Sequence, residues 1–583
     1  MEATGSNPVP SRFSPFSKHI FRLQIPQTGF IILNMKNITI TFPDNSTITV
    51  QDEIRPITLL SHFSDGAKKA IAVLVNNELC SLHSIINVSA KVEPVYADSK
   101  EGAAIYRRSL CFLLATAAHR LFPGRRLLVG HSLGHGYYYT IDGDLLTATQ
   151  IENLQSEMQK LVEEDLPIDA THISYMEACE LFEKLGLVET RKQLNYRSPS
   201  KIKINVLEEF ADLYVEPLVS STGILKTFDL LPYHEGFLLR FPSHHTPEEL
   251  APFVDQPKLF EIYKQYKEWG RAQDVTSASS LNQLIHDRKV NHFINITETL
   301  QVKRIAEIAD KIHERPEARV VLIAGPSSSG KTTTSKKLAL QLEALGYNPK
   351  VISLDCYYVG REQTPKDANG NYDYECLEAL DIELLNKNLL DMFEGKSVEI
   401  PSYDFHSGSR YYKGNTMTLA ENDILVMEGI HGLNDKLTPL IDPKRKFKIY
   451  LSALTQLNLD DHNRIATSDN RLIRRIVRDA HFRGKSAADT IAMWDNVQEG
   501  EKKHIFPFQN NADVMLNTAL DYEIPVLKVY ADPLLRCVTP LQKEYAEASR
   551  MLNFLSYFST IPATAVPDQS IIREFIGGSA FKY

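Results

Sequence analysis

Cysteine is scarce in this sequence. There are six cysteines in 583 residues, and no two of them form a CxxC pair. The sequence therefore favours neither a disulfide framework nor a zinc ribbon, and a reducing compartment such as the cytoplasm fits it. Long apolar runs are also missing. None approaches the roughly 18 residues that a membrane-spanning helix needs, so we expect no membrane association.

An excess of positive charge is missing as well. The formal net charge is −9 at pH 7, which argues against a surface that generally coats nucleic acid. The chain is too long for a single hydrophobic core, and its length suggests about three or four domains. Residues 1–34 contain Ser, Pro and Phe but no apolar core of a signal peptide. We expect them to form a flexible extension.

Patterning divides the amino-terminal half into three parts. In the first, residues 35–97, two alternating β-branched runs flank a Pro-Asp-Asn turn and predict a hairpin, and a second strand pair is expected around Asn76-Asn77. The whole reads as a β-grasp module. In the second, residues 98–215, YRRSLCFLLATAAHRLF and TATQIENLQSEMQKLVEE have helical spacing. Residues 216–318 read as a mainly helical connector.

Residues 319–535 alternate between strand and helix patterns. The expected strands are VVLIA, KVISLD, ILVMEG, KFKIYLS and, as a fifth, PVLKVY. Such alternation predicts an α/β domain with a doubly wound parallel sheet. Residues 536–583 are left as a carboxyl-terminal extension.

The segment GPSSSGKT, which begins at Gly325, matches G-x-x-x-x-G-K-[ST] in full. Glycine at Gly325 and Gly330 lets the backbone curl so that N–H groups point at phosphate oxygens, and the following helix directs its positive end at the anion. Lys331 would reach the β- and γ-phosphates, and the Thr332 hydroxyl would ligate Mg²⁺. An apolar strand before the motif and a helix after it argue against a chance match.

Two acidic residues follow predicted strands of this sheet. Asp355 is the last residue of KVISLD and would lie beside the γ-phosphate, because the carboxyl ends of parallel strands face the ligand crevice. There it could orient an acceptor hydroxyl and take its proton, although a helix N-cap is the alternative. Glu428 ends ILVMEG and suits a Walker-B acid near Mg²⁺, the alternative being a solvated strand end.

Four arginines, Arg471, Arg474, Arg475 and Arg478, have the spacing of one helical face. Such a face could close over ATP as a lid and stabilise charge on the transferring phosphoryl group. The alternative is a solvated basic face. Closeness in sequence to the phosphate-binding loop favours the lid.

The region 319–535 resembles the uridine kinase and phosphoribulokinase family of P-loop kinases. The resemblance is carried, in the family's order, by GPSSSGKTT, SLDCYY, NYDYECLEALD, PSYDF with Arg410, MEGI and DNRLIRRIVRD. It implies ATP and Mg²⁺ as cofactors and Asp355 as the general base. The family's base-reading histidine falls at Gly408 here, and the nearest imidazole is His406.

These considerations give the candidate site residues. The expected catalytic residues are Asp355, Lys331 and Arg474. The nucleotide is expected to contact Gly325, Ser327, Ser328, Ser329, Gly330, Lys331, Thr332, Thr333, Arg471 and Arg478. The acceptor is expected to contact Asp373, Tyr403, His406 and Arg410, and Thr332 and Glu428 are the expected metal ligands.

The amino-terminal half resembles threonyl-tRNA synthetases. Residues 35–97 are similar to the TGS domain, and residues 98–215 to the second additional domain of these enzymes, through RRSLCFLLATAAHRLFPG and GYYYTID. The family's metal-type histidine pair falls at Arg108 and Phe112, neither of which ligates zinc. We therefore expect a scaffold, dimer surface or sensor without editing chemistry.

The sequence supports a kinase for a small hydroxyl-bearing metabolite, with the 5′-hydroxyl of a nucleoside such as uridine or cytidine the leading acceptor. A sugar-phosphate kinase of the phosphoribulokinase type is one alternative, and an RNA-binding regulatory ATPase is another. The acidic net charge disfavours tRNA as a partner, and a homo-oligomer remains open.

Overall fold

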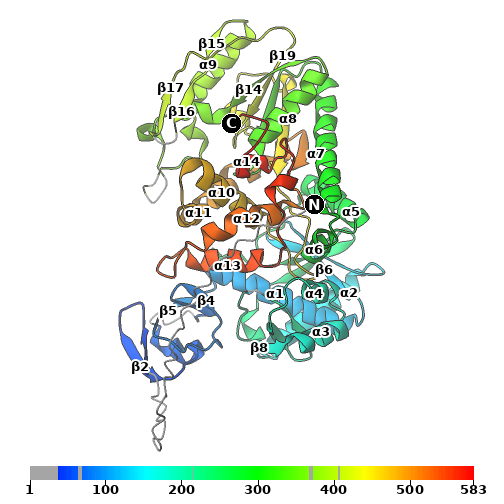
Figure 1. Cartoon of the computed structure of the whole chain (residues 1–583), viewed down its shortest axis with the longest axis vertical. Helices are drawn as coiled ribbons and strands as arrows, with labels where there is room; N and C mark the ends of the chain where they lie inside the picture. The colour runs from blue at the N-terminus through cyan, green and yellow to red at the C-terminus, as the bar shows by residue number, and fades with distance from the viewer. Residues whose placement is uncertain are drawn as a thin grey trace, which may run out of the picture.

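The computed structural model describes residues 37–63, 69–214, 216–366, 370, 372–404 and 407–582. The extension expected over residues 1–34 lies outside these residues. A small β-rich module and an α+β module lie side by side at one end of the molecule, and a parallel sheet with its helices lies at the other (Figure 1). No helix among the described residues has the length and apolar character that a bilayer crossing requires.

The first module is a five-stranded sheet of order β2-β1-β5-β3-β4. Its strands are β1 (Asn37–Thr41), β2 (Thr47–Gln51), β3 (Ala72–Val75), β4 (Glu78–Cys80) and β5 (Ala90–Val95). Both expected hairpins are confirmed. Asn76 and Asn77 have φ of 50° and 62°, the left-handed conformation that a two-residue hairpin turn requires and that asparagine tolerates.

The second module packs helices on two antiparallel sheets, of order β10-β9-β8 and β11-β12-β7-β6. Its elements are α1 (Lys100–Leu121), β6 (Leu127–Ser132), β7 (Gly136–Ile141), α2 (Ala148–Glu163), β8 (Asp169–Ser174), α3 (Tyr175–Lys184), α4 (Val188–Gln193), β9 (Lys201–Leu207), β10 (Phe210–Asp212), β11 (Asp229–Tyr233) and β12 (Gly236–Arg240). The two predicted helices are α1 and α2. The strands β11 and β12 fall in the expected helical connector, so the second module extends to about residue 240.

Helices α5 (Pro257–Ala272), α6 (Ala278–His286) and α7 (Val290–His313) connect the halves, as expected for residues 255–318. Helix α7 packs on α8 (Lys331–Ala344) and lies along the edge of the molecule in Figure 1. Its inward side chains, including Ile305, Ile308 and Ile312, join the core under the parallel sheet.

The carboxyl-terminal half is built on a parallel sheet of order β14-β19-β13-β20-β21, which confirms the predicted fold class. The strands are β13 (Val320–Ala324), β14 (Asn348–Ser353), β19 (Asp423–Glu428), β20 (Lys446–Ser452) and β21 (Val514–Asn517). Between β14 and β19 lie helix α9 (Ile382–Phe393) and the two-stranded ribbons β15 (Val398–Glu399)–β18 (Thr416–Met417) and β16 (Ser402–Asp404)–β17 (Ser409–Tyr411). Helices α10 (Thr467–Arg483) and α11 (Ala487–His504) lie between β20 and β21.

The prediction of PVLKVY as the fifth strand is wrong. These residues lie in helix α12 (Glu523–Leu535), and the fifth strand is β21. A short apolar run fits a buried helix as well as a buried strand. Here Ile524, Leu527 and Ala531 are all buried at helical spacing, which a period of two does not explain.

The carboxyl-terminal extension is an integral part of this half. Helices α13 (Tyr545–Leu555) and α14 (Arg573–Ile576) share one hydrophobic core with α10 and α12. Ile571, Ile572 and Phe575 are fully buried in that core. The extension therefore holds α14 against the phosphate-binding loop, as described below.

A loop of the carboxyl-terminal half, residues 458–464, is buried in the second module. The His462 Nδ1 lies 2.7 Å from Asp212 Oδ2, and both side chains are buried. Asn458 Nδ2 donates to Val129 O at 2.7 Å, and Asp461 pairs with Arg126. Because this loop leads directly into α10, the second module fixes the start of that helix.

The junction should make stability depend on pH. Burial and the nearby Asp212 raise the pKa of Asp460 to about 8, so the folded protein holds a proton there that the unfolded chain releases at about pH 4. A raised pKa gives stability that is complete below the unfolded pKa and is lost as pH rises through the folded one. As pH rises from about 4 to about 8, the melting temperature of wild type should therefore fall relative to that of Asp460→Asn. The asparagine mimics the protonated acid.

Thermal unfolding of both proteins across this range measures the difference. Asp460 Oδ1 accepts from His462 N and Asn463 N, and an asparagine oxygen retains both bonds. The variant should therefore fold. A difference in melting temperature that is independent of pH would show that Asp460 is ionised in the folded protein.

Candidate active site

The phosphate-binding loop joins β13 to α8. Gly330 has φ of 78°, and a Cβ atom at that position would lie 2.7 Å from Ile571 Cγ2, so glycine is required. A Cβ at Gly325 would lie 2.5 Å from Leu451 O. Lys331 Nζ folds back and donates to Gly325 O and Pro326 O at 3.0 and 3.1 Å. The loop therefore needs glycine at both positions, and its lysine is held by the loop's own carbonyls.

Two carboxylates occupy the anion-binding donors of this loop. Thr333 N and Oγ1 both donate to Glu574 Oε2, at 3.0 and 2.6 Å, in the first turn of α8. Ser327 N donates to Glu501 Oε1 at 3.0 Å. Helix N-termini and glycine-rich loops attract anions through such N–H groups. Glu574, from α14 of the extension, thus accepts from donors at the start of α8 of the kind that attract anions.

Asp355, Glu428 and the loop meet at the ends of three neighbouring strands. In the sheet order, β19 lies between β14 and β13, and Glu428 is in register with Ser353 of β14 and Ile323 of β13. Asp355 follows β14 in a 3-10 turn (Leu354–Tyr357). Thr332 Oγ1 lies 3.4 Å from Glu428 Oε1. The structure therefore brings together the predicted base, the predicted metal ligands and the phosphate-binding loop.

Burial controls the charge of these acids. It raises the pKa of Asp355, against the lowering effect of Lys331, Arg483 and Arg478. Burial and Asp355 together raise the pKa of Glu428 to about 7. A cation beside such a buried carboxyl would stabilise its ionised form. Mg²⁺ prefers oxygen ligands such as hydroxyl and carboxylate groups. The donor set of Thr332 and Glu428 therefore fits Mg²⁺.

The predicted lid arginines lie against the loop. Arg471 forms a two-pronged pair with Glu501 at 2.5 and 2.6 Å and donates to Ser327 O. Arg474 is fully buried, pairs with Glu523 and donates to Ser328 O at 3.2 Å. In this structure both arginines donate to backbone carbonyls of the loop. Their expected contact with a phosphate stays a prediction.

The other arginines of α10 lie nearer the crevice. Arg475 Nη1 donates to Ser327 Oγ at 2.8 Å, and Arg478 pairs with Asp479 at 2.8 Å. Arg478 and Arg483 both act electrostatically on Asp355. Arg483 was not predicted as a site residue, because it lies outside the helical spacing shared by the other four arginines.

Two of the predicted acceptor residues, Tyr403 and Arg410, lie on the β16–β17 ribbon, whose strand β16 contacts the 3-10 turn that carries Asp355. Tyr403 and Arg410 face each other across the β16–β17 ribbon, and Tyr403 lies 5.5 Å from Tyr358 between ring centroids. Arg410 Nη1 is paired with Asp381 Oδ2 at 2.7 Å. Gly408 has φ of 68°, and a Cβ atom there would lie 2.7 Å from Arg361 Nε, so the histidine of the family pattern would require Arg361 to shift. The predicted contact His406 lies outside the described residues.

Two further residues were missed by sequence reasoning. Glu375 is a carboxyl whose pKa is raised to about 7 by burial and by Glu501. His504, at the end of α11, has its Nε2 4.0 Å from Asp373 Oδ2. His504 lies far along the chain from the acceptor motifs, and no local pattern marks it. Glu375 lies inside the NYDYECLEALD motif, which did offer a signal.

In the amino-terminal half, the positions of the expected synthetase pair are structural. Arg108 Nη1 donates to Pro217 O at 3.1 Å, and Phe112 is fully buried with its ring 5.5 Å from that of Tyr214. Arginine and phenylalanine are not zinc ligands.

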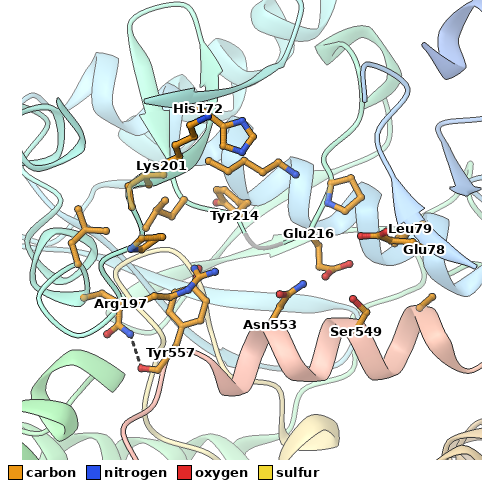
Figure 2. A pocket seen from close by; sticks show the side chains of 18 residues that line it. Glu78, Leu79, His172, Arg197, Lys201, Tyr214, Glu216, Ser549, Asn553 and Tyr557 are labelled. Atoms are coloured by element: carbon orange, nitrogen blue, oxygen red, sulfur yellow. Dashed lines mark hydrogen bonds between the residues drawn. The ribbon is translucent and has the colours of Figure 1, made fainter. Parts of the chain in front are cut away.

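A cavity of about 380 Å³ lies where both amino-terminal modules meet α13 (Figure 2). Arg197 lies over the ring of Tyr557 at 4.6 Å, and Gln193 Nε2 donates to Tyr557 O at 2.6 Å. Figure 2 shows Asn553 and Glu216 on facing walls. The extension and the amino-terminal half therefore contact each other away from the phosphate-binding loop.

The fold and this constellation define a P-loop kinase domain. Residues 320–525 match the model of the phosphoribulokinase / uridine kinase family. A uridine kinase from Macrococcus caseolyticus is 33% identical over 199 residues, which cover 34% of this chain and 86% of that protein. The chain belongs to the phosphoribulokinase/uridine kinase family, whose P-loop implies the use of ATP.

The amino-terminal part is similar to threonine–tRNA ligases. The ligase from Carboxydothermus hydrogenoformans is 32% identical over 198 residues, which cover 33% of this chain and 31% of the ligase. This chain thus spans about a third of the length of the ligases that it matches. Among solved structures, a D-glycerate 3-kinase from Cryptococcus neoformans is 13% identical, covers 44% of this chain and 87% of its own, and has a TM-score of 0.21.

Replacement of the predicted base tests the site directly. Asp355→Asn keeps the shape of the side chain but cannot accept a proton. We expect ATP affinity to be retained while kcat falls about 10²-fold or more, the usual scale of a lost general base. Steady-state kinetics with nucleotide-binding measurements separate the two quantities. Weakened ATP binding with unchanged kcat would instead identify Asp355 as a metal or structural residue.

Glu574 should compete with ATP. Its carboxylate must leave Thr333 N and Oγ1 before a phosphate can accept from them, so Glu574→Ala should tighten ATP binding. Hydrogen bonds to a charged group contribute about 1.5–3 kcal/mol, part of which water regains, so we expect a dissociation constant about 5- to 30-fold lower. Calorimetric titration measures it.

Glu574→Gln is the matched control, because it keeps the size and removes the charge. It should give an intermediate affinity. Unchanged or weaker ATP binding in both variants, with melting temperatures near that of wild type, would show that Glu574 does not occupy a phosphate position.

Proposed function

We propose that this protein transfers the γ-phosphoryl group of ATP, with Mg²⁺, to the 5′-hydroxyl of a nucleoside such as uridine or cytidine. The observation that carries the proposal is the convergence of the phosphate-binding loop, Asp355 and Glu428 at the ends of β13, β14 and β19. It is supported by the similarity to a uridine kinase over 86% of that protein.

Each residue has a defined part in this transfer. Lys331 exchanges its loop carbonyls for the β- and γ-phosphates. Thr332 and Glu428 would hold Mg²⁺, which would supply positive charge to neutralise the phosphates. Asp355 accepts the proton of the acceptor hydroxyl as the new P–O bond forms and the bond from phosphorus to ADP breaks. Arg478 and Arg483 lie beside Asp355, where negative charge spreads in the transition state.

Electrostatics on the acceptor side favour a neutral hydroxyl compound. A phosphorylated sugar brings a dianion that needs dedicated cationic donors. Arg410, the predicted acceptor contact, already has its charge compensated by Asp381. Asp373 and the ring of Tyr403 suit ribose hydroxyls and a stacked base. A nucleoside therefore fits this wall better than a sugar phosphate.

Substrate use distinguishes the acceptors. The purified protein with ATP should release ADP in the presence of uridine and cytidine, with much lower kcat/KM for ribulose 5-phosphate. Base discrimination should be loose, because Gly408 replaces a base-reading histidine and one lost hydrogen bond is worth about 0.5–1.5 kcal/mol, or roughly two- to twelvefold. His504→Ala should raise the KM for the nucleoside and leave the KM for ATP nearly unchanged. Use of the sugar phosphate alone would refute the proposed acceptor.

A further inference from the structure

An imidazole pair and a carboxylate from different halves of the molecule meet beside α11. His244 and His245 lie in the segment 241–256 between β12 and α5, and Glu499 lies on α11. One potential ligand atom from each lies within 4.8 Å of the other two. The rings of His244 and His245 are 3.9 Å apart between centroids. Residues distant in sequence thus place three donors of metal-binding type around one point.

The geometry suits a small transition-metal ion. Zn²⁺ binds imidazole nitrogen and carboxylate oxygen at about 2.0–2.2 Å, which places tetrahedral donors roughly 3.3–3.6 Å apart. The observed spacing of up to 4.8 Å is wider, so an ion would have to draw the three side chains together. Among the described residues, neither imidazole has a hydrogen-bond partner within the protein, so its nitrogens remain available. Two imidazoles also select against Mg²⁺ and Ca²⁺, which prefer oxygen donors.

The charges around these donors both oppose and support a cation. Lys502 Nζ donates to Glu499 Oε1 at 2.8 Å, and Lys100 pairs with Asp495 on the same helix at 2.8 Å. Burial and the adjacent His245 lower the pKa of His244, which keeps it in the neutral form that binds metal. An ion must therefore displace Lys502 from Glu499, so Lys502 competes with the ion for this carboxylate.

We propose that His244, His245 and Glu499 form a binding site for one divalent transition-metal ion of the Zn²⁺ type, which joins the amino-terminal half to α11. Water would complete the coordination. The ion would fix the helix that carries Glu501, whose carboxylate accepts from Ser327 N in the phosphate-binding loop. The site is separate from the Mg²⁺ position at Thr332 and Glu428, and it does not depend on the proposed acceptor.

The test uses the full-length protein after removal of metal with a chelator. Zn²⁺ and Co²⁺ are titrated separately, and bound metal is measured by elemental analysis after dialysis. We expect one bound ion per chain and a melting temperature that rises with Zn²⁺ concentration. The absorption spectrum of bound Co²⁺ in the visible range should be that of an ion with few ligands. Acidification should weaken binding, because protonated imidazole is not a ligand.

Three variants make the test specific. The double variant His244→Ala/His245→Ala should lose the ion and the thermal shift, whereas His292→Ala, an exposed histidine on α7, should keep both. Lys502→Gln frees Glu499 and should bind Zn²⁺ about two- to fivefold more tightly, on the scale of an exposed ion pair. Metal-free melting temperatures near wild type establish that the variants are folded.

The proposal fails if the chelated protein takes up no ion, or if the double histidine variant retains it. It also fails if Lys502→Gln binds Zn²⁺ no more tightly than wild type, since the competing ion pair would then be absent in solution. Kinase activity is not needed for any of these readouts, so the outcome is independent of the proposed reaction.

Discussion

The buried pair of Asp212 and His462 is the constraint on which the arrangement of the two halves depends. Burial opposes the charge on His462, but the hydrogen bond to Asp212 outweighs it and raises the pKa of the imidazole. Removing one partner would leave the other buried and uncompensated, at a cost of several kcal/mol. The loop 458–464 is therefore held firmly in the second module, and α10 begins three residues beyond it.

That constraint reaches the phosphate-binding loop through α10. Arg471 and Arg474 of this helix donate to carbonyls of the loop while their charges are compensated by Glu501 and Glu523. Helix α10, whose start is fixed by the amino-terminal half, thus supports the loop through these two arginines. The same half contacts α13 at the cavity in Figure 2, and α14 follows α13 to the loop. The synthetase-like half is therefore linked to the phosphate-binding loop by two sets of contacts, one along α10 and one along α13 and α14.

The sequence predicted those features that depend on local order. The glycines of the loop, the strand before it and the acids at the ends of β14 and β19 follow from motif and topology, because parallel strands present their carboxyl ends at one edge. It could not predict that Glu574 reaches Thr333, that Glu501 takes Ser327 N, or that His504 approaches Asp373. These contacts join distant segments, and no periodicity records them. PVLKVY was misassigned because an apolar run satisfies a buried helix and a buried strand alike.

The two carboxylates at the loop follow from the cost of unpaired donors. Backbone N–H groups at the start of a helix require acceptors, and a loop built to hold phosphates has several that point inward. Glu574 and Glu501 satisfy Thr333 N and Ser327 N in this structure. Glu501 has Arg471 as a second partner, whereas Glu574 is only half-buried and lies on a four-residue helix. We therefore expect Glu574 to be the acid that leaves the loop at lower cost, so that the carboxyl-terminal extension influences how readily the loop accepts a nucleotide.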